Sequence, residues 1–349
     1  MVQSYGWAAW GIHHTDIGQI DVAARSLARV NPGEGPSDDA AGGTWPLRRD
    51  LRLLWPVWSA FTAGLHGDLD TARRILAEVD QAAGDDPYAI TVWATFSVAM
   101  GALAGDATGV LTAAERGISV DPTWSYGFLG SYQRLGLCWA TAVLGDRPSD
   151  MAARAEQIIA SRLQHPPRSG LATWWCLVAE IWLLAGEPDA ASVALDRVDR
   201  SFASHGQRYP EGLHLLLRAQ LMMARGVPTT LVGSAAQRAA AVSTERGAHL
   251  FARRATAFLR TLRPGATCPA RPSAIACSAD SRPGHREVAG FVPGSWIVTA
   301  YMVSLWTPSR RSPTGTVRMG MKFGHVRNSP DQTSNQQQPP AQAMGRMRR

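Results

Sequence analysis

Apolar residues along much of the chain recur at the spacing of an α-helix rather than at that of a strand. Leu69, Ala72, Leu76 and Val79 form one such series, and a second runs over residues 191–198. Positions three or four residues apart lie on one face of a helix, so each series predicts an amphipathic helix with one buried side. A longer apolar run rich in Trp precedes each series and predicts a second, more deeply buried helix.

A glycine, usually followed by an acidic residue, separates each long apolar run from the amphipathic series that follows it in the chain. After a first gap of 49 residues these glycines are spaced by 38, 40, 41 and 40: Gly18, Gly67, Gly105, Gly145, Gly186 and Gly226. Glycine readily adopts the positive φ that ends a helix, and an acidic residue stabilises the start of the next one. We therefore expect an all-α fold over residues 1–262, an α-solenoid of five to six antiparallel helix pairs stacked as a right-handed superhelix.

Three of the units resemble the tetratricopeptide repeat, in which aromatic and small residues alternate on the first helix of each pair. The residues that carry this resemblance are Tyr132, Leu135, Gly136 and Trp139 in one unit, Trp175, Val178, Ala179, Trp182, Ala191 and Leu195 in a second, and Trp7, Trp10, Gly11, His14, Ala23 and Leu27 in a third. The period of about 40 residues is longer than the usual 34 of that family. The resemblance implies a tetratricopeptide-like domain whose first helices line a concave groove that binds a protein or peptide partner, or a small effector.

Residues 50–262 also resemble the C-terminal helical-repeat region of large actinobacterial regulators of the LuxR or AfsR type, or of regulators linked to nucleotide cyclases. Segments such as GQRYPEGLHLLLRAQ and STERGAHLFARRA carry this likeness. It implies the sensor or regulatory end of a signalling or transcriptional regulator. Two alternatives remain open: a non-catalytic fragment of a nucleotide cyclase or ATPase-type signalling enzyme, and a free-standing scaffold.

Two segments interrupt the helical pattern. Residues 31–49 are rich in Pro, Gly and Asp and predict a mobile insertion loop. Residues 263–349 lose the helical period, end in low-complexity sequence and predict a disordered tail, either genuine or the product of a frameshift. Within this tail the uncharged run 288–306 approaches the length of a membrane span, but its Pro and Gly residues make membrane insertion the less favoured interpretation.

Charge and composition exclude several classes of function. Of the 35 basic and 28 acidic residues, 11 and 3 lie in 264–349, which leaves 24 and 25, a net charge of −1, in the first 263 residues. The helical part therefore lacks the positive surface that nucleic acid requires. Lys322 is the single lysine, and it fits no phosphate-binding or Schiff-base motif. We expect no catalytic residues, no bound metal and no cofactor, and a cytoplasmic protein with reduced cysteines.

Seven residues are the candidates for binding a ligand or partner in the groove. They are one Glu together with aromatic and Arg residues: Tyr132, Arg134, Arg168, Trp174, Arg208, Tyr209 and Glu211. Arg guanidinium groups form paired hydrogen bonds with carboxylates and phosphates, so the arginines could recognise an anion. The competing interpretation is that the aromatic residues pack between helices and that the charged ones cap helices or pair across repeats.

The change of composition at Leu262 generates a first prediction. A segment as poor in periodic apolar positions as 263–286 cannot bury enough surface to offset its backbone entropy. We expect limited trypsin digestion to cut first between Arg263 and Arg286 and to leave a helical fragment of about 260 residues. Mass spectrometry of the early products checks this; first cuts between residues 50 and 262 would contradict it.

Overall fold

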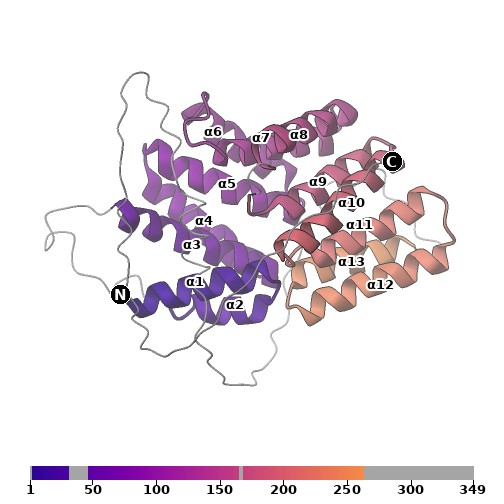
Figure 1. Ribbon diagram of the computed structural model, residues 1–349, viewed down its shortest axis with the longest axis horizontal. Helices are drawn as coiled ribbons and strands as arrows, with labels where there is room; N and C mark the ends of the chain where they lie inside the picture. The colour runs from indigo at the N-terminus through magenta and orange to yellow at the C-terminus, as the bar shows by residue number, and fades with distance from the viewer. Residues whose placement is uncertain (1, 31–45, 165–167, 263–349) are drawn as a thin grey trace, which may run out of the picture. The chain divides into compact units, whose positions relative to one another are not determined.

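The computed structural model describes residues 2–30, 46–164 and 168–262. Within these ranges it contains thirteen α-helices and no β-strand, which confirms the all-α prediction (Figure 1). The proposed disordered tail 263–349 and most of the insertion loop 31–49 lie outside the described residues. The helices are α1 Val2–Asp16, α2 Ile20–Leu27, α3 Pro46–His66, α4 Leu69–Ala83, α5 Pro87–Ala104, α6 Ala107–Val120, α7 Leu129–Val143, α8 Pro148–Arg162, α9 Leu171–Leu184, α10 Pro188–His205, α11 Glu211–Ala224, α12 Thr229–Glu245 and α13 His249–Thr261.

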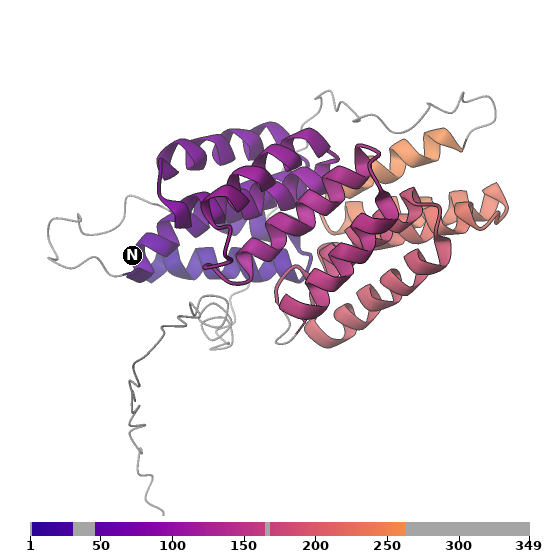
Figure 2. The same ribbon diagram turned by 90° about the horizontal axis from the view of Figure 1, so that it is seen from above.

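Consecutive helices pack against each other, and the two helices of each pair are joined by a short turn (Figures 1 and 2). All six glycines that the spacing singled out lie in such turns, with φ between 73° and 103°, a conformation that side chains with a Cβ rarely adopt. The acidic residue behind the glycine caps the next helix in two places. Asp68 accepts a hydrogen bond from the Thr71 amide at 3.0 Å, and Asp106 accepts one from the Gly109 amide at 2.9 Å.

The second helices of the pairs bury the faces that their spacing predicted. In α10, the four residues Ala191, Ala194, Leu195 and Val198 are 0% exposed. On the first helices, small residues allow close contact between neighbours: a Cβ on Gly136 of α7 would lie 2.0 Å from Cγ1 of Val98 in α5. Such a distance is shorter than any van der Waals contact, so only glycine fits at this crossing.

The odd-numbered helices α3, α5, α7, α9, α11 and α13 contact one another in order, and α13 also contacts α3. The contact between α13 and α3 closes the row of helices, and the first pair, α1–α2, also packs against the later helices. The Ile20 amide donates to the Arg246 carbonyl at 3.0 Å, and the Arg208 amide donates to the Asp16 carbonyl at 2.6 Å. In an open solenoid each repeat touches only its neighbours. The start and the end of the described chain therefore depart from that expectation by packing on each other.

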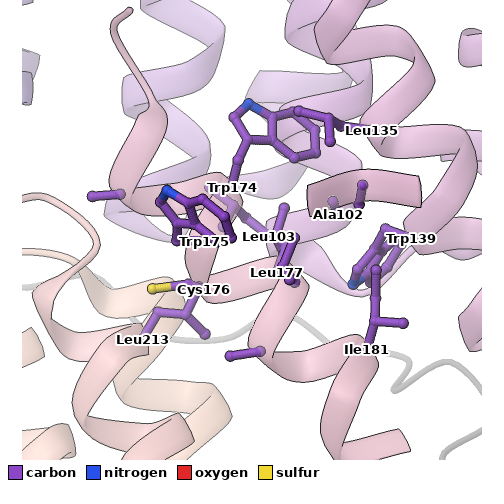
Figure 3. Packing of buried hydrophobic residues seen from close by; sticks show 14 of the residues in the cluster. Ala102, Leu103, Leu135, Trp139, Trp174, Trp175, Cys176, Leu177, Ile181 and Leu213 are labelled. Atoms are coloured by element: carbon purple, nitrogen blue, oxygen red, sulfur yellow. The ribbon is translucent and has the colours of Figure 1, made fainter. Parts of the chain in front are cut away.

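The main hydrophobic core cluster joins residues of the odd-numbered helices to residues of the even-numbered helices that pack on them. Figure 3 shows Trp139, Trp174 and Trp175 among leucines and alanines that come from α5, α7, α9 and α11. Trp139 and Trp175 are each 2% exposed. Many side chains of the odd-numbered helices are thus packed inside the protein.

An ion pair lies next to this core and joins helices that are far apart in sequence. Arg254 of α13 pairs with Glu180 of α9, and their side chains are only 17% and 16% exposed. Glu180 also accepts a hydrogen bond from Nε1 of Trp139 in α7 at 2.9 Å. Arg254 donates a second bond to the Leu103 carbonyl at the end of α5, at 3.1 Å. Four helices therefore meet at one charged pair.

Helix α5 is the one described helix that is long and apolar enough to cross a membrane. Its 18 residues have a mean hydropathy of 1.3, and 56% of that window is buried inside the protein. It contacts α3, α4, α6 and α7. These contacts give α5 the surroundings of a core helix.

The charged pair generates the second prediction. Glu180→Gln keeps the shape and the acceptor for Trp139 but leaves the Arg254 guanidinium largely desolvated without a counter-charge, which we expect to lower the free energy of unfolding by about 3 kcal/mol. Glu78→Gln is the matched control, because its pair with Arg74 is exposed and is worth about 0.5 kcal/mol. Urea denaturation measures both; equal losses in the two variants would show that the central pair contributes no more than a surface pair.

Candidate functional site

Four of the seven candidate groove residues are buried rather than facing an open groove. Tyr132, Arg134, Trp174 and Tyr209 are 6%, 8%, 3% and 4% exposed. The three aromatic residues among them have the burial that the packing interpretation expects.

Arg134 organises the loop that precedes α7. Its guanidinium donates to the carbonyls of Gly130 at 3.0 Å and Pro122 at 3.1 Å, and it lies over the Trp124 ring at 4.1 Å. These contacts use the donors that would otherwise recognise an anion. Arg134 thus holds this loop against the start of α7.

Tyr132, Trp174 and Tyr209 pack between neighbouring helices. The rings of Tyr132 and Trp174 stack with centroids 5.8 Å apart, and the Tyr132 hydroxyl donates to the Ser169 carbonyl. The Tyr209 hydroxyl accepts a hydrogen bond from Thr173 at 2.5 Å, and its ring meets Phe61 edge-on at 5.5 Å. Burial raises the pKa of the Tyr209 hydroxyl, so this group stays protonated.

The remaining three candidates are partly buried and engage nearby residues of the protein. Arg168 lies over the Phe128 ring at 4.8 Å, and Arg208 lies over the Phe202 ring at 5.3 Å. Glu211 pairs with Arg246 at 2.5 Å, which connects α11 to the end of α12. Each of the two arginines thus lies over a phenylalanine ring. The pair Glu211–Arg246 is an inter-helix contact of the kind that the competing interpretation expected.

A polar cluster that the sequence pattern did not indicate lies where the α1–α2 turn meets the α10–α11 loop. Gln207, 7% exposed, donates from Nε2 to the Asp16 carboxylate at 3.1 Å and to the Ser169 hydroxyl at 3.4 Å. The amides of Arg208 and Tyr209 both point at the Asp16 carbonyl. Asp16 and Gln207 are 191 residues apart, and neither belongs to a motif, so no local signal marks the cluster.

A cavity beside this cluster is too small for a ligand. Its volume is about 10 Å³, and it is lined by Arg168, Ser169, Leu171, Ala172, Ser201, His205 and Gln207. A space of this size holds about one water molecule, whereas pockets for small ligands measure roughly 300–1,000 Å³. The cluster is thus suited to joining two loops and not to enclosing an effector.

The two cysteines in the described residues are poor nucleophiles. Both Cys138 and Cys176 are buried. Burial raises the pKa of the Cys138 thiol to about 11 and raises that of Cys176 further. A thiol reacts through its thiolate, so these side chains behave as small apolar groups.

One group of potential metal ligands converges within the described ranges. A ligand atom from each of Asp21, His66 and His249 lies within 4.8 Å of those from the other two. Desolvation and the neighbouring His66 lower the pKa of His249, which favours its neutral form. The adjacent pair His13–His14 belongs to another cluster, where the two rings pack with Trp10.

Exposed apolar side chains gather at the turns of three successive helix pairs. Four of the six large apolar residues that are exposed in the described chain lie there, each at least 40% exposed: Leu144, Leu184, Met223 and Leu231. A fifth, Val193, is 49% exposed and lies in the second turn of α10. Leu144, Leu184 and Met223 are at the C-terminal ends of α7, α9 and α11, and these helices contact each other in order. Because consecutive helices alternate in direction, these ends lie along the same edge. We call these five residues the turn-edge row.

No known protein family, curated protein or solved structure matches the chain.

Asp16 generates a prediction about pH. Burial raises the pKa of its carboxyl to about 6, and the hydrogen bond from Gln207 opposes this only in part. Because the folded pKa exceeds the unfolded one, the native protein binds the proton more tightly, and stability falls as the pH rises from about 4 through 6. A shift of about two units corresponds to at most about 3 kcal/mol, and partial exposure reduces it, so we expect about 1–2 kcal/mol.

The variant Asp16→Asn removes this titration and keeps an oxygen for Gln207. Its stability relative to the wild-type protein should increase by about 1–2 kcal/mol between pH 4 and pH 7. Asp70→Asn, at a carboxylate that is 81% exposed, is the control and should show no such trend. Urea denaturation at several pH values decides; a constant difference between Asp16→Asn and wild type would contradict the assigned environment.

Proposed function

We propose that this chain is a non-enzymatic, tetratricopeptide-like helical-repeat domain that binds a protein partner through the turn-edge row. The observation that carries the proposal is the concentration of exposed apolar side chains on one edge of the pairs α7–α8, α9–α10 and α11–α12. Scattered single apolar residues are normal on protein surfaces, whereas several on neighbouring repeats along one edge favour an interaction site. The site of binding thus differs from the concave groove that the family resemblance implied.

The surroundings of the row suit a protein rather than a small molecule. Arg218 pairs with Asp196 and Asp199, and Arg225 pairs with Asp189, so exposed charges of both signs accompany the apolar residues on α10 and α11. An apolar centre with a polar, charged border is the usual composition of a protein–protein interface. A small effector in the groove is less well supported, because the inner faces of the odd-numbered helices are packed.

The regulatory assignment follows from the same binding role. In the large regulators that residues 50–262 resemble, this part is a sensor or regulatory region, and a partner-binding edge would serve such a protein. We accordingly propose a cytoplasmic role in signalling or transcriptional control, exerted through protein contacts and without nucleic-acid binding by the helical part.

A matched pair of triple variants tests the binding edge. Leu144→Asp, Leu184→Asp and Met223→Asp together place three charges on the row, where the side chains are exposed and the fold should tolerate them. We expect the tagged wild-type protein to retain a discrete set of proteins from cytosol of its own source, and the triple variant to lose them at least tenfold by quantitative mass spectrometry.

The control carries the same three charges on the opposite edge, at the exposed positions Ser119→Asp, Gln164→Asp and Thr244→Asp. It should retain what the wild type retains. Equal retention by all three proteins would refute the turn-edge row as the binding surface. Hydrolysis of ATP or GTP that stays with the purified chain through successive columns would refute the non-enzymatic role.

A further inference from the structure

Three side chains with metal-ligating atoms meet where the first pair of helices touches the last helix. Asp21 lies in the first turn of α2, His66 is the last residue of α3, and His249 is the first residue of α13. Nε2 of His66 is 3.1 Å from Oδ1 of Asp21, and the rings of His66 and His249 lie 5.1 Å apart at a steep angle. We call these three residues the seam cluster.

The backbone around the seam cluster is held in place independently of it. The Ile20 amide, one residue before Asp21, donates to the Arg246 carbonyl at 3.0 Å. Arg253 donates to the carbonyl of Gly67, the residue that follows His66, at 2.7 Å. Gly247 has φ of 72°, and a Cβ there would lie 2.4 Å from Oδ1 of Asp21, so the α12–α13 turn approaches the carboxylate as closely as a backbone can. The three ligands are thus presented by fixed elements.

The donor set and its spacing suit a borderline divalent cation such as Zn²⁺. Two imidazole nitrogens and one carboxylate oxygen are the ligands of many three-residue zinc sites, which leave a fourth position for water. With bonds of about 2.0–2.1 Å, tetrahedral ligand atoms lie about 3.4 Å apart. The pair Asp21–His66 already has this spacing, and all three ligand atoms lie within 4.8 Å. The side chains of Asp21 and His66 are 49% and 42% exposed, which leaves the fourth position open to solvent.

We propose that Asp21, His66 and His249 bind one divalent transition-metal cation of the Zn²⁺ class, which clamps the first helix pair and α3 to α13. This proposal is independent of the proposed partner binding, since the turn-edge row lies on other helices. A cation shared by three helices stabilises the closed arrangement, because it binds only where the three are together. The nearby Arg253 guanidinium opposes the positive ion, so we expect micromolar rather than tighter affinity.

Metal titration of the full-length, tag-free chain tests the site. Cys268 and Cys277, which lie outside the described residues, are replaced by Ser in every sample so that their thiols do not compete. We expect isothermal titration with ZnCl₂ to show one saturable site and the melting temperature to rise by several degrees. Co²⁺ in place of Zn²⁺ should give d–d absorption without the charge-transfer band of thiolate ligands.

Variants of single ligands identify the residues. His249→Gln and Asp21→Asn should each weaken Zn²⁺ binding by roughly 100-fold and abolish the rise in melting temperature, since loss of even an outer-shell partner costs 10–100-fold. His205→Gln removes an exposed imidazole at the end of α10 and should change neither. Far-UV circular dichroism of the metal-free variants checks that they fold. If His249→Gln does not fold, Asp21→Asn provides the test, because asparagine has nearly the same shape as aspartate.

Two results would overturn the proposal. One is the absence of saturable binding in the folded parent protein. The other is unchanged affinity in folded His249→Gln or Asp21→Asn, which would place the bound metal elsewhere. Neither outcome affects the turn-edge row, whose variants are tested by partner retention without added metal.

Discussion

The ion pair between Glu180 and Arg254 is the constraint around which the helices of this protein are arranged. Both side chains are more than four-fifths buried, and a buried charge is tolerated only when its partners satisfy it. Trp139 and the Leu103 carbonyl provide the further hydrogen bonds. Because these groups belong to α5, α7, α9 and α13, the last helix has one position in which the pair is satisfied, and that position brings it against α3.

Closure of the helices determines which surfaces remain for binding. An open repeat array offers its inner face to a ligand, but here the inner faces of the odd-numbered helices pack on one another around Trp139 and Trp175. Most of the large apolar residues left exposed in the described chain lie at or near the turns of the last three helix pairs. The same closure brings Asp21 and His66 to His249. The proposed partner-binding edge and the proposed metal site therefore both depend on this one arrangement of the helices.

The burial of the candidate arginine and tyrosine residues shows why residue type alone did not locate a site. Arg134 uses its guanidinium to hold the carbonyls of a single loop, and Tyr209 uses its hydroxyl to join α9 to the start of α11. A guanidinium that binds backbone and one that binds an external anion look the same in a sequence. The contacts of such a side chain depend on whether it lies on the buried or the exposed side of its helix. The spacing of apolar residues indicates the buried side of amphipathic helices such as α4 and α10, but not that of the nearly uniformly apolar α5 and α9.

The sequence by itself determined the elements: the helical class, the order of helices and turns, the positive φ at Gly67 and its equivalents, and the buried face of α10. These features depend on backbone conformation and on side chains three or four residues apart, so a local pattern is sufficient to predict them. Only the tertiary structure decided that α13 returns to α3, that Arg254 pairs with Glu180, and that Asp21 meets His249. Those contacts join residues 74 and more apart, and an isolated charged residue carries no local signal of which distant partner it will meet.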